Sequence, residues 1–116
     1  MLGDLGLLLT DRVTVLAAGD GVNRAGEHYP DWDNPIVVGE FAAGVQGRAT
    51  WEYSQAREGA KATFRVYFAP EVPVDNKCRL GWGSVVLEVA GIPRLVVDHL
   101  RAVPHHLEVD AKEVVG

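Results

Sequence analysis

A stretch of alternating apolar and polar side chains, residues 61–70, constrains the fold of this chain more than any other segment. Every second residue in it is apolar, a spacing that places one row of side chains on a single face of a β-strand. Its aromatic and β-branched residues also suit a half-buried sheet surface. Pro70 ends the stretch, because proline has no backbone N–H for a sheet ladder. We therefore predict a strand whose buried row is Ala62, Phe64, Val66 and Phe68.

Further segments alternate in the same way between turn-forming residues. They are residues 11–18, 45–53, 84–90, 92–98 and 106–112. Thirteen glycines and six prolines scattered among short apolar runs favour an all-β domain over a helical bundle. About six strands at fairly regular spacing predict a small barrel or sandwich. With 116 residues, the chain is expected to form a single domain, residues 1–116.

Short connections between these strands predict two hairpins. A polar segment separates strands 45–53 and 61–70, and we predict that it forms a hairpin tip. This tip consists of Ser54, Gln55, Ala56, Arg57, Glu58, Gly59 and Ala60. Ala90 and Gly91 are expected to turn residues 84–90 back onto residues 92–98. Pro93 favours an outer position in the sheet for the second of these two strands.

Two segments outside the predicted strands have more than one interpretation. Residues 1–10, which include Leu7 and Leu8, are predicted to be an N-terminal arm. Packing of this arm on the sheet is the favoured alternative, and docking on a neighbouring subunit is the other. Residues 19–35 are rich in Gly, Asn, Asp and Pro, which predicts a long loop. Tyr29 and Trp32 in this loop either fold it back on the domain or form an interface, and neither alternative is favoured.

The charge and the cysteine content exclude several classes of protein. A net charge of −5 and a pI of about 5.2 argue against a surface that coats nucleic acid, because such surfaces neutralise phosphates with Lys and Arg. A single cysteine, Cys78, excludes an internal disulfide and fits a reducing compartment. The apolar N-terminal residues lack the basic start and the length of a signal peptide or a membrane span. We expect no contact with a membrane.

A search for catalytic residues predicts no enzyme and no cofactor. The two serines, Ser54 and Ser84, lie outside any Gly-x-Ser-x-Gly setting. A lone cysteine in a strand, as Cys78 is predicted to be, is more typical of a small core residue than of a nucleophile. One cluster has the residue types of a zinc site, namely Asp98, His99, His105, His106 and Glu108. Its spacing fits ordinary surface histidines better than metal ligands, so we predict no metal site.

Several of these pieces together resemble the head-to-tail stopper, or head-closure, proteins of tailed bacteriophages. The resemblance covers most of residues 11–115, and its motifs are patterns and spacings without an invariant signature. The matching pieces are the opening Asp-Arg-Val-Thr-Val at 11–15, Tyr-Pro-Asp-Trp-Asp-Asn-Pro at 29–35, Val-Tyr-Phe-Ala-Pro at 66–70, Val-Ala-Gly-Ile-Pro at 89–93 and His-Leu-Glu-Val at 106–109.

The resemblance implies a small SH3-like β-barrel that assembles as a homo-oligomeric ring, a hexamer or a dodecamer, in the neck of the virion. Such a ring lies beneath the portal and adaptor proteins, retains the packaged DNA without sequence-specific binding, and offers a docking face to the tail terminator or tail tube. It would be assembled in the host cytoplasm. In this interpretation the tip, residues 54–60, gates the channel, and Tyr29, Trp32, Leu7 and Leu8 contact other subunits.

Two other classes remain open at this point. One is a different neck or tail component, such as a tail terminator. The other is a monomeric SH3-like module that binds a peptide in an aromatic groove. Trp32, Trp51 and Trp82 are the tryptophans available to such a groove.

Overall fold

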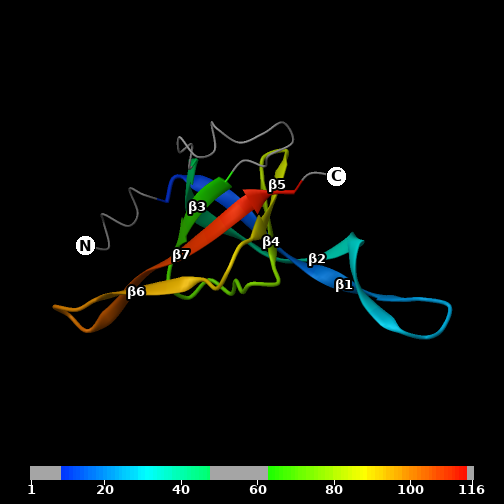
Figure 1. Ribbon diagram of the computed structural model, residues 1–116. Coiled ribbons are helices and arrows are strands. Elements are labelled where there is room, and N and C mark those ends of the chain that lie inside the picture. Colours follow the sequence, from blue (N-terminus) through cyan, green and yellow to red (C-terminus); the bar gives the residue numbers. More distant parts are fainter. Residues whose placement is uncertain (1–8, 48–62, 115–116) are drawn as a thin grey trace.

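In a computed structural model, which describes residues 9–47 and 63–114, the chain is all-β and its strands pair in antiparallel fashion (Figure 1). The strands are β1 (Asp11–Val22), β2 (His28–Gly47), β3 (Thr63–Phe68), β4 (Arg79–Trp82), β5 (Val85–Val89), β6 (Arg94–Asp98) and β7 (Val103–Glu113). The prediction of an all-β chain is confirmed. Over these two ranges no helix is long and apolar enough to cross a membrane.

The strands form one sheet that closes on itself. Its order is β3-β2-β1-β4-β5-β7-β6, and an additional pairing of β3 with β7 joins the two sides into a ring of strands. Strand β7 makes this possible because it is long: β3 pairs with it from Leu107 to Lys112. Strand β6 pairs with its first half and β5 with its last residues. β6 therefore lies outside the ring, at the end of the sheet.

The core fills the inside of this ring. Its buried apolar residues come from every strand except β6 and from the connection between β3 and β4; they are Val13, Val15, Ala43, Val66, Phe68, Val72, Cys78, Leu80, Leu87, Val89, Leu107, Val109 and Ala111. The strand predicted over residues 61–70 is observed as β3, with Val66 and Phe68 fully buried and Phe64 packed against the core. Ala62 lies outside the described residues. Cys78 is a buried core residue, so its predicted place in the core is confirmed.

A two-stranded arm, residues 17–38, takes the place of the predicted loop over residues 19–35, so that prediction is wrong. The outer parts of β1 and β2 pair there from Gly19 with Asp31 to Val22 with His28. The glycine, asparagine and proline residues of this segment have low strand propensity and suggested a loop. Backbone pairing between β1 and β2 nevertheless holds them in strands. Pro30 is tolerated because β2 pairs with β3 only from Ala43 onward, which leaves the outer edge of β2 unpaired in the described residues.

Irregular pairing separates the arm from the ring. The β1–β2 register shifts between Val15 and Leu16, and again between Ala17 and Gly19. Across the second shift, Ile36 is the partner of Ala17 and Asp31 is the partner of Gly19, so residues 32–35 bulge out of β2. Such bulges bend a strand and increase its twist. The arm consequently leaves the ring as a projection (Figure 1).

A second projection, which we call the finger (residues 94–106), is the hairpin of β6 with the start of β7. The predicted hairpin of residues 84–90 with 92–98 is wrong, because β5 and β6 do not pair with each other and instead both pair antiparallel with β7, one after the other along it. The predicted outer position of the strand after Pro93 is confirmed. Arm and finger point in opposite directions (Figure 1). They explain a radius of gyration of 16.0 Å, where a compact chain of this length would have about 13 Å.

The turn of the finger contains a strained residue that offers a test of the fold. Ala102 has a φ of 54°, in the left-handed region that a side chain disfavours. We expect Ala102→Gly to raise the free energy of unfolding by about 1 kcal/mol, because glycine adopts this conformation without steric cost. Gly91 has a φ of 79° and open space where a Cβ would lie, so Gly91→Ala should have the opposite effect. Urea denaturation of both variants measures the free energy of unfolding. Equal effects of the same sign would contradict the left-handed conformation of Ala102.

Candidate functional site

Only part of the predicted site lies within the described residues. The tip at residues 54–60 and the N-terminal Leu7 and Leu8 lie outside them. Tyr29 and Trp32 both lie on the arm, in β2. The arm, the pocket at its root, the finger and a polar network on the ring are therefore the candidate sites that the structure describes.

Tyr29 is placed by the cross-strand pairing of the arm. It is the register partner of Gly21 in β1, and its ring occupies the space where a Cβ of Gly21 would lie. A glycine is thus needed at this position so that the aromatic ring can lie flat across the hairpin. About half of the Tyr29 side chain remains exposed. Tyr29 therefore stiffens the arm and leaves one aromatic face open for a contact.

Exposed apolar side chains continue along the arm toward the ring. Ile36, Val37 and Val38 follow one another in β2 and are 56%, 64% and 42% exposed. Three successive exposed β-branched residues put apolar surface on both faces of the ribbon, because neighbours in a strand point to opposite sides. Soluble surfaces rarely carry such runs without a function. These residues give the arm an exposed apolar surface.

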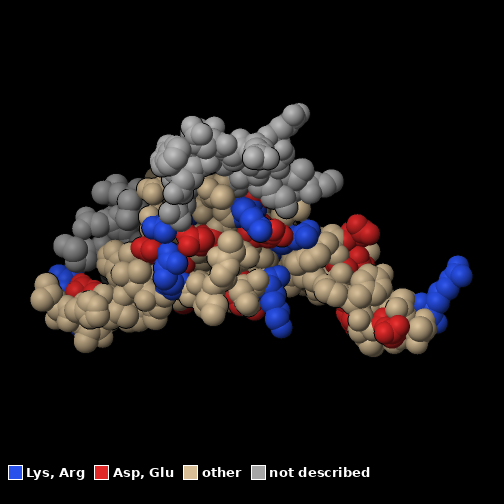
Figure 2. Space-filling model, in the orientation of Figure 1, with Lys and Arg blue, Asp and Glu red and all other residues tan. Residues whose placement is uncertain are grey.

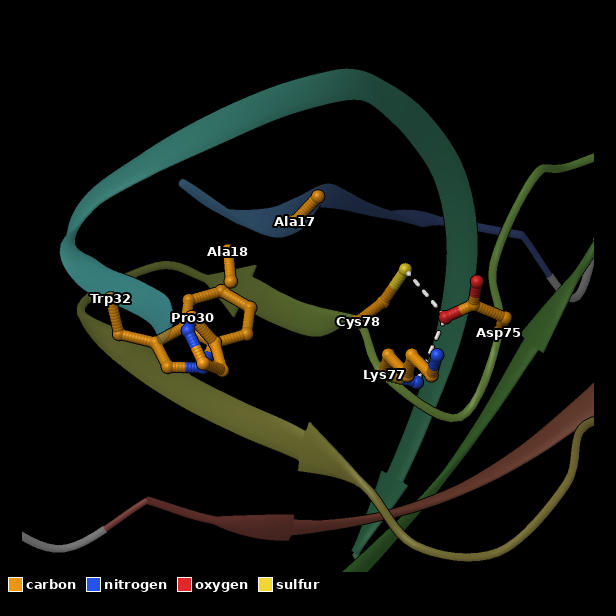
Figure 3. Close-up of a pocket in the computed structure, with 7 residues that line it drawn as sticks. All are labelled: Ala17, Ala18, Pro30, Trp32, Asp75, Lys77 and Cys78. Carbon is orange, nitrogen blue, oxygen red and sulfur yellow. Dashed lines mark hydrogen bonds between the residues drawn. The ribbon is translucent and has the colours of Figure 1, made fainter. Parts of the chain in front are cut away.

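A pocket of about 400 Å³ lies at the root of the arm, between the arm and the connection that leads into β4 (Figure 3). Its walls are mostly apolar, and they are formed by Ala17, Ala18, Pro30, Trp32, Asp75, Lys77 and Cys78. Trp32 is held against the ring of strands by Arg79 of β4, whose guanidinium lies 4.3 Å from the centre of the indole ring. Trp32 therefore contacts the domain through Arg79, which matches the first predicted alternative, and it also lines a recess. The interface alternative stays a prediction.

The polar residues of this pocket are held in place and are poor candidates for catalysis. Asp75 accepts hydrogen bonds from the backbone N–H of Lys77 at 2.8 Å and from the thiol of Cys78 at 3.4 Å. These bonds lower the pKa of Asp75, the Lys77 N–H having the larger effect. Burial raises the pKa of the Cys78 thiol. A thiol that stays protonated is a weak nucleophile, so the pocket is suited to binding and not to covalent chemistry.

The finger carries apolar residues as well. Leu95, Val97, Leu100 and Val103 are exposed, and Leu100 at the turn is 98% exposed. Asp98 holds this turn in shape, since its carboxylate accepts hydrogen bonds from the backbone N–H groups of Leu100 at 3.0 Å and Arg101 at 3.3 Å. A second hollow, of about 470 Å³, lies at the root of the finger beside Leu95 and Pro104. The finger thus presents a leucine on an ordered turn.

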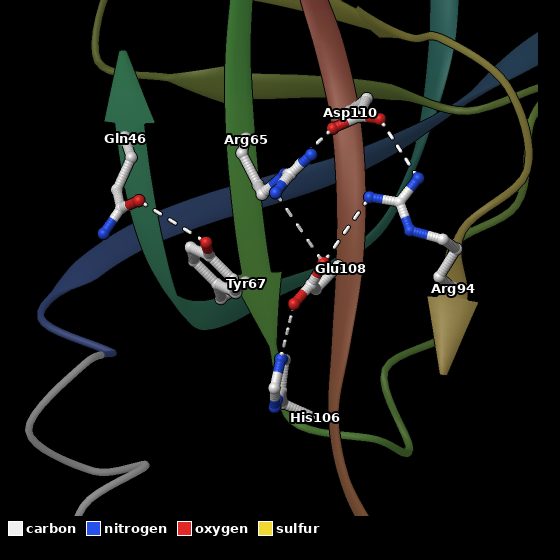
Figure 4. A network of polar contacts seen from close by, with 7 residues as sticks. All are labelled: Gln46, Arg65, Tyr67, Arg94, His106, Glu108 and Asp110. Atoms are coloured by element: carbon white, nitrogen blue, oxygen red, sulfur yellow. Dashed lines mark hydrogen bonds and ion pairs between the residues drawn. The ribbon is translucent and has the colours of Figure 1, made fainter. Parts of the chain in front are cut away.

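A polar network lies on the outer face of β3, β6 and β7 (Figure 4). Arg65 of β3 donates to Asp110 of β7 at 3.1 Å, and Arg94 of β6 donates to Asp110 at 3.2 Å and to Glu108 at 3.4 Å. His106 contacts Glu108 at 3.0 Å. Two arginines from two strands therefore hold two carboxylates of the strand between them, which ties the finger to the ring.

The pKa shifts in this network have separate physical causes. For Glu108, the hydrogen bond with His106 is the main influence that lowers the pKa, and Arg94 adds to it. For Asp110, burial is the largest single influence and acts to raise the pKa, but the bonds from Arg65 and Arg94 together outweigh it and lower the pKa. The bond to Asp110 raises the pKa of Arg65. Both carboxylates are consequently ionised at neutral pH, which suits a structural role and not that of a general acid.

The histidines considered for zinc are placed differently from a metal site. His105 and His106 contact each other at 2.7 Å through their Nδ1 atoms, and His106 turns its other ring nitrogen to Glu108. Within residues 9–47 and 63–114, no three residues among His, Cys, Asp and Glu are arranged to hold a metal ion. Acidic and basic side chains are interspersed over the face seen in Figure 2, without a continuous basic patch for nucleic acid.

Sequence reasoning missed three features of this surface: the finger, the pocket and the network. The pocket and the network join residues that are distant in the chain, such as Ala17 with Cys78 or Arg65 with Asp110, whereas the finger is a local hairpin. The alternation of β7 does place His106, Glu108 and Asp110 on one face, so one side of the network was visible in the pattern. That Arg65 faces these residues could not be predicted, because it depends on the pairing register of β3 with β7, which no local sequence pattern contains.

Comparisons with known proteins show a shared fold. No known protein-family profile matches the chain, and no curated protein sequence matches it. The fold is similar to the solution structure of protein SF1141 from Shigella flexneri 2a, with a TM-score of 0.62, 22% identity, and coverage of 90% of this chain and 92% of that one. It is also similar to a chain of the virion of a native gene transfer agent particle, with a TM-score of 0.63, 20% identity, and coverage of 93% and 97%. At these identities the likeness concerns the fold.

Proposed function

We propose that this protein is a structural component of a phage-like virion, namely a ring-forming head-to-tail stopper in the neck with an SH3-like barrel as its body. The observation that carries the proposal is the similarity to a gene transfer agent virion chain over nearly the whole of both chains. A fold can serve many functions, so this similarity is an argument by analogy. The resemblance of the sequence to stopper proteins supports it independently.

The geometry supports a structural role over a catalytic one. The polar residues of the pocket hydrogen-bond within the pocket, and those of the network hydrogen-bond within the network. The arm and the finger, in contrast, expose apolar side chains on the described surface. A small ring of strands has little flat surface of its own, so projections provide contact area between subunits. The proposed role is therefore non-enzymatic and needs no cofactor.

The proposed partners follow from the position in the neck. Copies of the chain form a closed ring, a hexamer or a dodecamer, between the portal and adaptor proteins on one side and the tail terminator or tail tube on the other. Packaged DNA fills the channel without sequence-specific binding. The net charge of −5 fits this, because an acidic lining repels phosphates and lets DNA pass without adhering. The ring would be assembled in the host cytoplasm, away from membranes.

The proposed gate is the tip formed by Ser54, Gln55, Ala56, Arg57, Glu58, Gly59 and Ala60. It connects β2 and β3, and β3 is the strand whose pairing with β7 closes the ring. Leu7 and Leu8 of the N-terminal arm and Tyr29 and Trp32 of the β1–β2 arm are the proposed contacts with other subunits.

Deletion of the gene from the virus or particle that encodes it tests this proposal. Electron microscopy should then show heads that package DNA and lose it, together with free tails. Tails attached to DNA-filled heads would refute a stopper. Heads that keep their DNA, with tails of irregular length, would support a tail terminator instead. Normal particles together with a purified monomer that binds short peptides would support the peptide-binding module.

Replacement of residues 54–60 by a short Gly-Ser turn separates gating from assembly. We expect particles that contain the protein and carry tails but leak DNA, because the ring forms while the gate is missing. Immunoblotting of purified particles and measurement of nuclease-sensitive DNA provide the two readouts. Ile92→Ser, on an exposed turn outside the tip, the arm and the finger, should leave DNA retention unchanged, and leakage from both variants would contradict a specific gate.

A further inference from the structure

The arm has the properties of a surface that is covered when the protein is assembled. In the part of the chain that the structure describes, β2 pairs with β3 only over Ala43–Gly47, and β1 pairs with β4 only over Thr14–Leu16. The arm beyond these points is a two-stranded ribbon with two open edges. An isolated ribbon of this kind is marginally stable in water. Burial of the exposed Ile36, Val37 and Val38 against a partner would therefore stabilise the arm.

The pocket at the root of the arm, about 400 Å³ with mostly apolar walls, has room for an apolar side chain of a partner. Interface energies are dominated by anchors that fill such recesses, and tryptophan is enriched among the residues that form them. Trp32 is pre-arranged here because Arg79 stacks on its ring at 4.3 Å. The recess is therefore formed before any partner binds, which lowers the ordering cost of binding.

The finger carries the matching anchor. Leu100 is 98% exposed, and the hydrogen bonds of Asp98 hold its turn in one shape. A leucine held in this way on a rigid turn can enter a recess with little loss of conformational freedom. The finger and the arm lie at opposite ends of the molecule (Figure 1).

Charge decides between contacts of arm with arm and of arm with finger. Residues 17–38 contain four acidic residues, Asp20, Glu27, Asp31 and Asp33, and one arginine, Arg24, which gives a net charge of −3 with His28 neutral. Residues 94–106 contain Arg94, Arg101 and Asp98, which gives +1 with the histidines neutral. Two arms placed together would repel each other, whereas an arm and a finger attract.

We propose that Leu100 on the finger of one copy inserts into the Trp32 pocket at the arm root of the next copy. Because the two surfaces differ and lie at opposite ends, the contact is head-to-tail, and repetition of it generates a closed ring when the rotation between copies allows. This inference deepens the proposed function, since it names the contact by which the ring is built. Ile36 is the register partner of the pocket residue Ala17, so the exposed Ile36–Val38 run lies beside the pocket and is covered in the same contact.

Disulfide crosslinking within particles tests this contact, because the pocket already contains the single cysteine of the chain, Cys78. Particles are produced with Leu100→Cys, treated with a mild oxidant, and separated on a non-reducing gel with immunoblotting. We expect a ladder of covalent oligomers from the variant and a monomer band from the unchanged protein. Because Cys78 is largely buried, the Ala18→Cys and Leu100→Cys double variant serves as a second test with a more accessible thiol on the same wall.

Two controls make the ladder specific. Ile92→Cys places a thiol on another turn, where the side chain is 79% exposed, and should give no ladder. Cys78→Ala combined with Leu100→Cys should abolish the ladder above the dimer, because each copy then carries one thiol. A protein that is present in particles but gives no ladder with either test variant would overturn the contact and leave the proposed function standing. Absence of the unchanged protein from purified particles would overturn the proposed function instead.

Discussion

Phe68→Ala is expected to lower the free energy of unfolding by about 3–5 kcal/mol, the range for removal of a buried phenylalanine. Phe68 is fully buried and lies in β3, opposite Ala43 of β2 and Leu107 of β7. The phenyl group of Phe68 thus packs where β2 and β7 both pair with β3. The surrounding backbone cannot fill the cavity left by alanine without disrupting the closed ring of strands. Urea denaturation followed by tryptophan fluorescence measures the loss.

Two other positions serve as controls for this result. Phe64, in the same strand, is half-buried and packs edge-on against Trp82 with ring centres 5.6 Å apart, so Phe64→Ala should cost less than Phe68→Ala. Ile92 is exposed on a turn, and Ile92→Ala should change the free energy by no more than about 0.5 kcal/mol. A loss at Phe68 no larger than that at Ile92 would contradict the ring closure through β3.

Asp110→Asn is expected to have the next largest effect, a loss of about 1–3 kcal/mol. The Asp110 carboxylate accepts hydrogen bonds from Arg65 and Arg94, and its side chain is only 28% exposed. The amide keeps the shape but removes the negative charge that lies between two guanidinium groups. Glu40→Gln is a matched control, because the Glu40–Arg12 pair is well exposed and should change the free energy by less than about 1 kcal/mol.

The same network predicts how stability depends on pH. The pKa values of Glu108 and Asp110 in the folded protein lie below their ordinary values of 4.5 and 3.8. The folded state therefore binds fewer protons than the unfolded state as the pH falls through this range, so acid favours unfolding. Stability should be constant above about pH 5 and decline progressively below it. Asp110→Asn should flatten this decline, and an unchanged acid profile would show that the network does not contribute to it.

The strand over residues 61–70 and most of its core could be predicted because its information is local. One face of β3 is buried, and alternation reports a buried face directly. The arm could not be predicted in the same way. Pro30, Gly19 and Gly21 are turn-forming residues by composition, yet cross-strand backbone pairing and an open edge allow them all in strands.

The incorrect hairpin of β5 with β6 has a different cause. Gly91 has a φ of 79°, so the chain does bend there, but it does not reverse. β5 and β6 both pair antiparallel with β7 and therefore run in the same direction. What the local pattern could not show is that both strands pair with one edge of β7, opposite β3, and not with each other. The pocket and the network depend on the same kind of information. Trp32 and Arg79, for example, meet only because β4 pairs with β1 beside the root of the arm.

The position of β7 in the ring has a consequence for synthesis of the protein. β7 is the final strand of the described chain, yet it supplies the closing partner of β3 and the second partner of β5. During translation, these strands emerge long before the segment that pairs with them. Until residues 103–113 leave the ribosome, β3 and β5 each carry an open apolar edge, the kind of surface that pairs with other nascent chains. Fragments that stop before Val103 should therefore aggregate, although they contain most of the core residues.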